Sequence, residues 1–192
     1  MPFPALIEVE TLDGTNGFQI VGAAVGDNSG GAVGTAGDPN GDGFADARNG
    51  AFGADPDGAY SGAAYVVFGG PGVRPSELSV ADLDGSNGFR LRGGVAGDRL
   101  GWAVASAGDV NGDGLDDLIV SGWNGDRGDG VAYVVFGRTD GYAAEVDLDT
   151  LDGSNGFKID DRRDAGKSIS SAGDVNGDGF ADLIIGAYFS RT

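Results

Sequence analysis

The chain has 192 residues, with 30 acidic and 12 basic side chains, and its formal net charge is −18. A chain this acidic, without a basic stripe, is a poor candidate for binding nucleic acid or an anionic membrane, and it has no apolar run long enough for membrane insertion. The absence of Cys excludes disulfides and thiolate metal sites, but it does not fix the compartment.

Glycine is unusually frequent in this chain. There are 39 glycines, about three times the typical usage, and no collagen-like triplet period accompanies them. They therefore indicate turns between many short strands. Because no stretch shows helical periodicity either, the sequence predicts an all-β fold.

Two motifs recur at intervals of roughly 65–71 residues. Leu-Asp-Gly-(Thr/Ser)-Asn-Gly-Phe begins at Leu12, Leu83 and Leu151, and Ala-Tyr-Val-Val-Phe-Gly begins at Ala64 and Ala132. Asp-Gly and Asn-Gly are strong signals for tight turns. The first motif is thus interpreted as a turn before a strand. The alternative is a weakly binding cation site at Asp13, Asp84 or Asp152.

In chain order, residues 1–22 are expected to supply one strand, at residues 18–21. This strand would be the outer strand of a sheet module, or blade, that either precedes the first repeat or closes the last one. Residues 23–93 form a first repeat, residues 94–160 a second, and residues 161–192 part of a third. In the second repeat the pattern predicts strands at residues 101–107, 117–122, 131–136 and 157–160.

Four-stranded antiparallel sheets repeated along a chain predict a β-propeller, in which radial packing protects the strand edges. The chain then holds about two and a half to three blades, whereas closed propellers have about four to eight. The alternative architecture is a β-sandwich built from hairpins. An incomplete ring predicts self-association, or further repeats, to complete it.

A third motif, Asp-x-Asn-Gly-Asp-Gly-x-x-Asp, begins at Asp38, Asp109 and Asp174. Side-chain oxygens at positions 1, 3, 5 and 9 and a main-chain carbonyl at position 7 suit a hard cation such as Ca²⁺. Glycines at positions 4 and 6 allow the backbone to curl around it. The expected ligands of the three Ca²⁺ sites are Asp38, Asn40, Asp42, Phe44 and Asp46; Asp109, Asn111, Asp113, Leu115 and Asp117; and Asp174, Asn176, Asp178, Phe180 and Asp182.

The alternative for these loops is a set of Asx-rich turns without an ion. That arrangement would crowd three carboxylates together, at a cost of several kcal/mol in a low-dielectric setting. Calcium is therefore expected, in a structural rather than a catalytic role.

The three loops, together with Phe68-Gly69 and Phe136-Gly137, resemble the FG-GAP repeats that form the seven-bladed propeller of integrin alpha subunits. The segment Asp-Gly-Ser-Asn-Gly-Phe is similar in sequence to the FG-GAP repeats of secreted bacterial proteins. One departure is the Gly-Ala-Pro element of the family, because an aromatic residue replaces its proline at Phe52, Trp123 and Tyr188. The resemblance implies an extracellular or cell-surface scaffold for adhesion or interaction, with a protein or a glycan as ligand.

Two other features suggest ligands. Arg127-Gly128-Asp129 spells a tripeptide that integrins recognise, although it lies in a loop already rich in Gly and Asp. Aromatic residues form either a carbohydrate platform or ordinary core packing. They are Trp102, Trp123, Tyr65, Tyr133, Tyr142 and Tyr188.

No enzyme is expected. The chain has no His or Cys and no Ser in a nucleophile elbow, and most clustered carboxylates belong to the loops. Two other functions remain open: a calcium-dependent carbohydrate-binding lectin, and an accessory domain of a secreted hydrolase.

Overall fold

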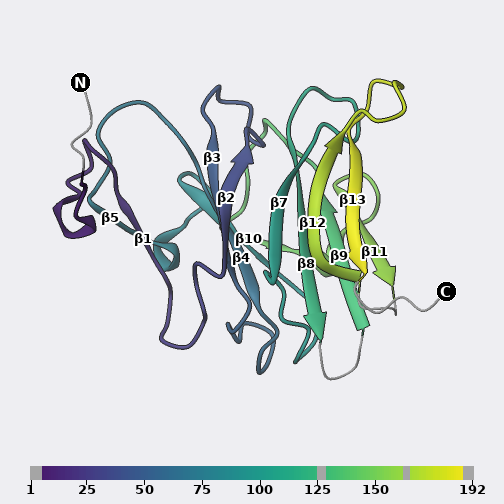
Figure 1. Cartoon of the computed structure of the whole chain (residues 1–192), viewed down its shortest axis with the longest axis horizontal. Helices are drawn as coiled ribbons and strands as arrows, with labels where there is room; N and C mark the ends of the chain where they lie inside the picture. Colours follow the sequence, from purple (N-terminus) through teal and green to yellow (C-terminus); the bar gives the residue numbers. More distant parts are fainter. Residues whose placement is uncertain (1–5, 125–128, 162–164, 188–192) are drawn as a thin grey trace.

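The computed structural model describes residues 6–124, 129–161 and 165–187, and nearly every element in them is a strand (Figure 1). The strands are β1 (Gln19–Val21), β2 (Ala32–Gly37), β3 (Asp46–Ala51), β4 (Ala63–Val67), β5 (Glu77–Ser79), β6 (Gly88–Arg92), β7 (Ala103–Gly108), β8 (Asp117–Asn124), β9 (Asp129–Val135), β10 (Glu145–Asp147), β11 (Gly156–Asp161), β12 (Ala165–Gly173) and β13 (Asp182–Ala187). The 3-10 helices are η1 (Val9–Thr11), η2 (Val80–Asp82) and η3 (Leu148–Thr150).

Two complete blades stand side by side in the middle of the molecule. Strands β2, β3, β4 and β6 form one antiparallel meander, and β7, β8, β9 and β11 form the other. The hairpin β12–β13 follows at one end of the long axis and the pair β1–β5 lies at the opposite end (Figure 1). The chain is therefore an incomplete β-propeller, as predicted. We call the units containing β2, β7 and β12 the first, second and third blades.

Strands β5 and β10 were not predicted, and they join neighbouring blades. Each lies in the connection between the third and fourth strands of one blade and pairs in parallel with the outer strand before it, β5 with β1 and β10 with β6. The first blade therefore has five strands rather than four. Ion pairs reinforce this join, because Arg92 contacts both Glu145 at 3.1 Å and Asp147 at 2.9 Å.

The apolar core lies in layers between the blades. Since alternate side chains of a strand point to opposite faces of its sheet, each complete blade contributes to two layers. In β4, Val66 faces the second blade while Tyr65 faces β1 and β5. In β8, Leu118 faces the first blade while Ile119 faces the third. Stability therefore depends on contact between successive blades.

Small residues allow the inner strands to approach closely. Ala36 and Ala107 are fully buried, and a Cβ atom at Gly50 would collide with the Gly101 carbonyl oxygen of the next blade. A side chain at Gly50 would push these two blades apart. No helix in the described ranges is both long and apolar enough to cross a membrane.

Candidate metal centres

The three acidic loops connect the first and second strands of successive blades, β2 to β3, β7 to β8 and β12 to β13. All three lie at the same end of the molecule (Figure 1). The glycines at positions 4 and 6 adopt positive φ in every loop, from 69° at Gly41 to 93° at Gly179. The predicted curl of the backbone is therefore present.

Local hydrogen bonds hold each loop closed. In the first loop, Asp38 accepts N–H bonds from Asp42 at 3.0 Å and Gly43 at 2.9 Å, and Asp42 accepts the Phe44 N–H at 2.8 Å. The second and third loops repeat this pattern. Because the carboxylates are turned to these N–H groups, no three acidic side chains converge into a ready-made metal site among the residues that the structure describes.

The aspartate at position 9 has a second role that the sequence did not suggest. Asp46 accepts the Gly69 N–H at 2.6 Å, and Asp117 accepts the Gly137 N–H at 2.8 Å. These glycines belong to the Phe-Gly pairs at the ends of β4 and β9. The carboxylate that starts the second strand of each complete blade therefore also anchors the end of its third strand.

The first loop contains a buried oxygen without a partner. Asp117 and Asp182 each accept an N–H bond from position 2 of their own loops, from Val110 and Val175 respectively. In the first loop position 2 is Pro39, which has no N–H. Asp46 is only 2% exposed, and its Oδ2 has no hydrogen-bond partner. A bound cation would supply the missing partner.

Electrostatics favour a cation at the same place. Burial, together with a smaller effect of the nearby charges of Asp42 and Asp38, raises the pKa of Asp46 to about 6. Burial is likewise the largest cause that raises the pKa of Asp117 to about 6, with smaller contributions from Asp113 and Asp109. The donor set consists only of oxygen atoms, which matches Ca²⁺ rather than a soft metal. The residues present therefore fit a hard divalent cation.

These pKa values predict an unusual pH dependence in the chelated protein. Between about pH 4 and pH 6 the folded state holds more protons on Asp46 and Asp117 than the unfolded state does, because their folded pKa is raised. The stabilising effect of this protonation is lost as pH rises through about 6. In EDTA, we expect a higher melting temperature near pH 5 than near pH 7. A melting temperature that falls between pH 7 and pH 5 would contradict this.

The Leu-Asp-Gly-(Thr/Ser)-Asn-Gly-Phe segments are closed turns. Asp13, Asp84 and Asp152 each accept a hydrogen bond from the hydroxyl two residues later, at 2.6 to 2.7 Å. These hydroxyl bonds are the main cause of the lowered pKa of all three carboxyl groups. The structure thus favours the turn interpretation over a second cation site.

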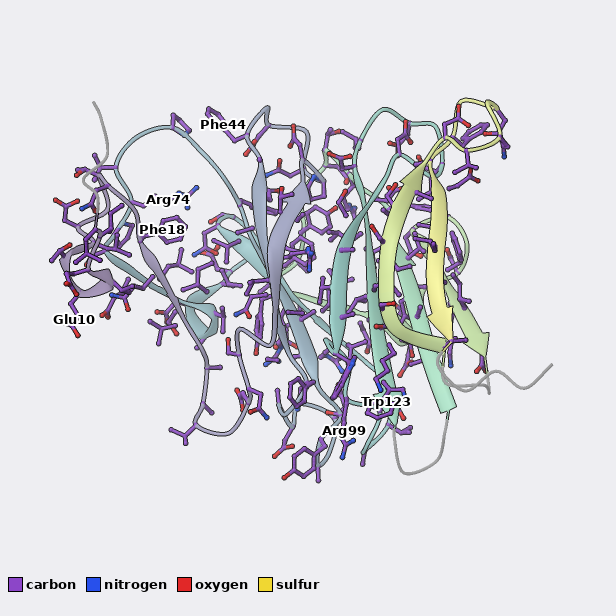
Figure 2. The ribbon with its side chains drawn as sticks, viewed as in Figure 1. Glu10, Phe18, Phe44, Arg74, Arg99 and Trp123 are labelled. Atoms are coloured by element: carbon purple, nitrogen blue, oxygen red, sulfur yellow. The ribbon has the colours of Figure 1, made fainter. Side chains whose placement is uncertain are left out.

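Most of the candidate platform residues are buried. Tyr65, Tyr133 and Tyr142 are at most 9% exposed and belong to the layers between blades. Trp102 and Trp123 are partly exposed, with ring centroids 4.8 Å apart, and Phe52 extends this row at 5.0 Å from Trp102. Figure 2 shows Trp123 at the end of the molecule opposite Phe44 and the acidic loops.

Two features lie outside the described residues. Tyr188 is one, and the Arg127-Gly128 part of Arg127-Gly128-Asp129 is the other.

Comparison with known proteins finds similarity to an FG-GAP repeat and to integrin alpha subunits. The model of the FG-GAP repeat matches residues 165–192. Integrin alpha-PS2 of Drosophila melanogaster is 30% identical over 96% of this chain. Integrin alpha pat-2 of Caenorhabditis elegans is 37% identical over 48% of the chain, and integrin alpha-IIb of Mus musculus is 32% identical over 47%. The chain spans only 13%, 7% and 8% of these three relatives.

Proposed function

Because the chain belongs to the FG-GAP repeat family, related to integrin alpha subunits, we propose that it is a calcium-binding propeller segment that serves as an extracellular interaction scaffold. The observation that carries this proposal is the unpartnered, buried Oδ2 of Asp46, which lies beside the carboxylates of its acidic loop. The loop repeats in three successive blades.

Calcium has a structural role in this proposal. In each loop the side chains at positions 1, 3, 5 and 9 and the carbonyl at position 7 hold the ion. The ion offsets the repulsion between carboxylates, and through Asp46 and Asp117 it ties the second strand of a blade to the end of its third strand. Such loops suit an extracellular setting, because extracellular calcium modules work with a Kd of about 10⁻⁴–10⁻³ M.

A scaffold fits the described residues better than an enzyme does. Asp46 and Asp117 are the acidic groups whose pKa burial raises to about 6, and both are held by N–H groups at the loops. A free acid or base poised near neutral pH would be expected at a catalytic site. Burial raises the pKa of both carboxyl groups at the proposed calcium sites, so these shifts give no separate support for a catalytic acid or base.

The row of Phe52, Trp102 and Trp123 favours a lectin as the second candidate, because aromatic rings at a surface stack on sugar rings. All three residues are partly exposed, and Lys167 lies over the Trp123 ring at 4.5 Å. A glycan array probed in calcium separates the two functions. The scaffold proposal predicts no calcium-dependent glycan binding. Binding that disappears in Trp123→Ala, but persists in the control Tyr60→Ala, would replace the scaffold with a lectin; Tyr60 is an aromatic residue 56% exposed.

A further inference from the structure

Successive acidic loops pack on one another in a repeating way. The position-7 side chain of each later loop covers the position-4 glycine of the loop before it. A Cβ atom at Gly41 would lie 2.9 Å from Leu115, and one at Gly112 would lie 2.5 Å from Phe180. The Ala181 N–H also donates to the Asp109 carbonyl at 2.8 Å. Each loop therefore has a donor side, which carries the covering side chain at position 7, and a receiving side, which carries the covered glycine at position 4.

One donor side and one receiving side remain uncovered in the described part of the chain. Phe44 is the position-7 residue of the first loop, and it lies on the side of the first blade toward Phe18 and Arg74, away from the second blade (Figure 2). It is 41% exposed. At the other end of the molecule, a Cβ atom at Gly177 of the third loop, or at Gly173 at the end of β12, would meet nothing within 4 Å.

The sequences of these two uncovered sides match those of an existing contact. Phe44-Ala45 is identical to Phe180-Ala181, which packs on the second loop. The receiving segment at residues 106–114 is identical, over all of its length, to the segment at residues 171–179 of the third loop. The contact between the second and third loops can thus be repeated, residue for residue, between the first loop of one molecule and the third loop of another.

On the strands beside these loops, apolar side chains are also exposed at the two ends of the molecule. Val104 and Ile119 face neighbouring blades and are 3% and 0% exposed. Their counterparts at the two ends, Val33 in β2 and Ile184 in β13, are 65% and 59% exposed. Val33 lies beside a hollow of about 230 Å³ on the first blade. This hollow is also lined by Ile20 and Ala47, together with Arg48 and Asn49. An apolar side chain at one end therefore has a partly apolar surface to cover at the other.

We propose that copies of this chain associate head to tail, with the third blade of one copy packed against the first blade of the next. Phe44 then covers Gly177, and Ile184 covers the hollow beside Val33. Strands β12 and β13 of one copy take the inner positions of a blade whose outer positions are β1 and β5 of the next copy. This shared blade is one strand short, so the inner strands and loops carry the contact.

This inference rests on the proposed function, because the acidic loops form part of the contact. Each loop carries three aspartates at its ligand positions, and two such loops repel one another unless cations offset their charge. A head-to-tail contact is also heterologous, so it leads to rings or to open chains rather than to symmetric dimers alone. That property gives the contact a distinctive test.

The test uses variants that block one end each. Val33→Lys blocks the first blade, and Ile184→Lys blocks the third; both side chains are exposed, so neither substitution disturbs the core. In calcium, sedimentation velocity should show a mass that rises with concentration for the unsubstituted protein and a monomer for each variant alone. An equimolar mixture of the two variants should form dimers and nothing larger, because only one pair of ends remains free.

Controls separate this proposal from the calcium proposal. Val95 is 57% exposed and lies in the connection between β6 and β7, not on either of the two end faces. The Val95→Lys variant should therefore associate as the unsubstituted protein does. Phe44→Ala should weaken association at least tenfold. A monomer at every soluble concentration, association unchanged in both Lys variants, or a mixture that stays monomeric would overturn the head-to-tail contact. Calcium titration of the monomeric Ile184→Lys variant tests ion binding independently of association.

Discussion

Chelating calcium with EDTA is expected to lower the melting temperature of this protein by roughly 8–16 °C. A site held at tenfold saturation contributes about 1.4 kcal/mol to the free energy of unfolding, so three sites contribute about 4 kcal/mol. For a chain of this size, each 1 kcal/mol shifts the melting temperature by about 2–4 °C. Removing the ions also leaves carboxylates repelling one another in every loop. Calorimetry with calcium and then with EDTA measures the difference.

The control for this experiment is a triple variant, Asp42→Asn, Asp113→Asn and Asp178→Asn. These positions are the fifth in each loop, so the variant keeps the side-chain shapes but loses a charge at each proposed site. Its melting temperature should respond only weakly to EDTA. An unsubstituted protein that melts at the same temperature with calcium and with EDTA would argue against a structural role for the ion.

Asp117→Ala is expected to lower the free energy of unfolding by about 3–5 kcal/mol in saturating calcium. Asp117 is fully buried and accepts N–H bonds from Val110 and Gly137, each at 2.8 Å. Alanine leaves both donors without a partner and removes a proposed calcium ligand. Since domains are stable by only about 5–15 kcal/mol, this loss should be visible in urea unfolding.

Asp182→Ala is the matched control for that variant. Asp182 occupies the same loop position in the third blade and accepts the Val175 N–H, but it is partly exposed. Both variants lose a ligand, whereas only Asp117→Ala also releases the Phe-Gly end of a third strand. Asp182→Ala should therefore cost clearly less. Equal losses in the two variants would show that the bond from Gly137 to Asp117 contributes little.

The sequence predicted the regular part of the fold because its signals are local. The expected strand at residues 117–122 corresponds to β8, and the expected strand at residues 131–136 corresponds to β9. In the second acidic loop, the Asn111-Gly112 and Asp113-Gly114 pairs mark turns through backbone preferences that neighbouring residues alone determine. The curled acidic loops were predictable for the same reason.

Strands β5 and β10 were missed because their partners lie in another blade. Each has only three residues, and pattern analysis cannot distinguish such a short strand from a loop. A signal was nevertheless present, since Glu77 and Glu145 each precede a Leu-Asp-Gly turn at a similar distance. Comparing the two connections would have shown that this segment is also repeated.

Part of the candidate site also depended on tertiary structure. The ligand pattern was visible in the sequence, but the bonds from Gly69 to Asp46 and from Gly137 to Asp117 join residues about 20 positions apart. The orphan oxygen of Asp46 follows from Pro39 at position 2, where the other loops have valine. The sequence held one signal for these longer bonds, because a Phe-Gly pair lies about 20 residues after each of Asp46 and Asp117.

Isothermal titration of the chelated and dialysed protein with CaCl₂ tests the central claim most directly. The account predicts three bound ions per chain, one for each acidic loop, and two for a variant in which Asp109 and Asp113 are both replaced by Asn. A titration that shows no calcium binding in the millimolar range, with the protein folded, would contradict it.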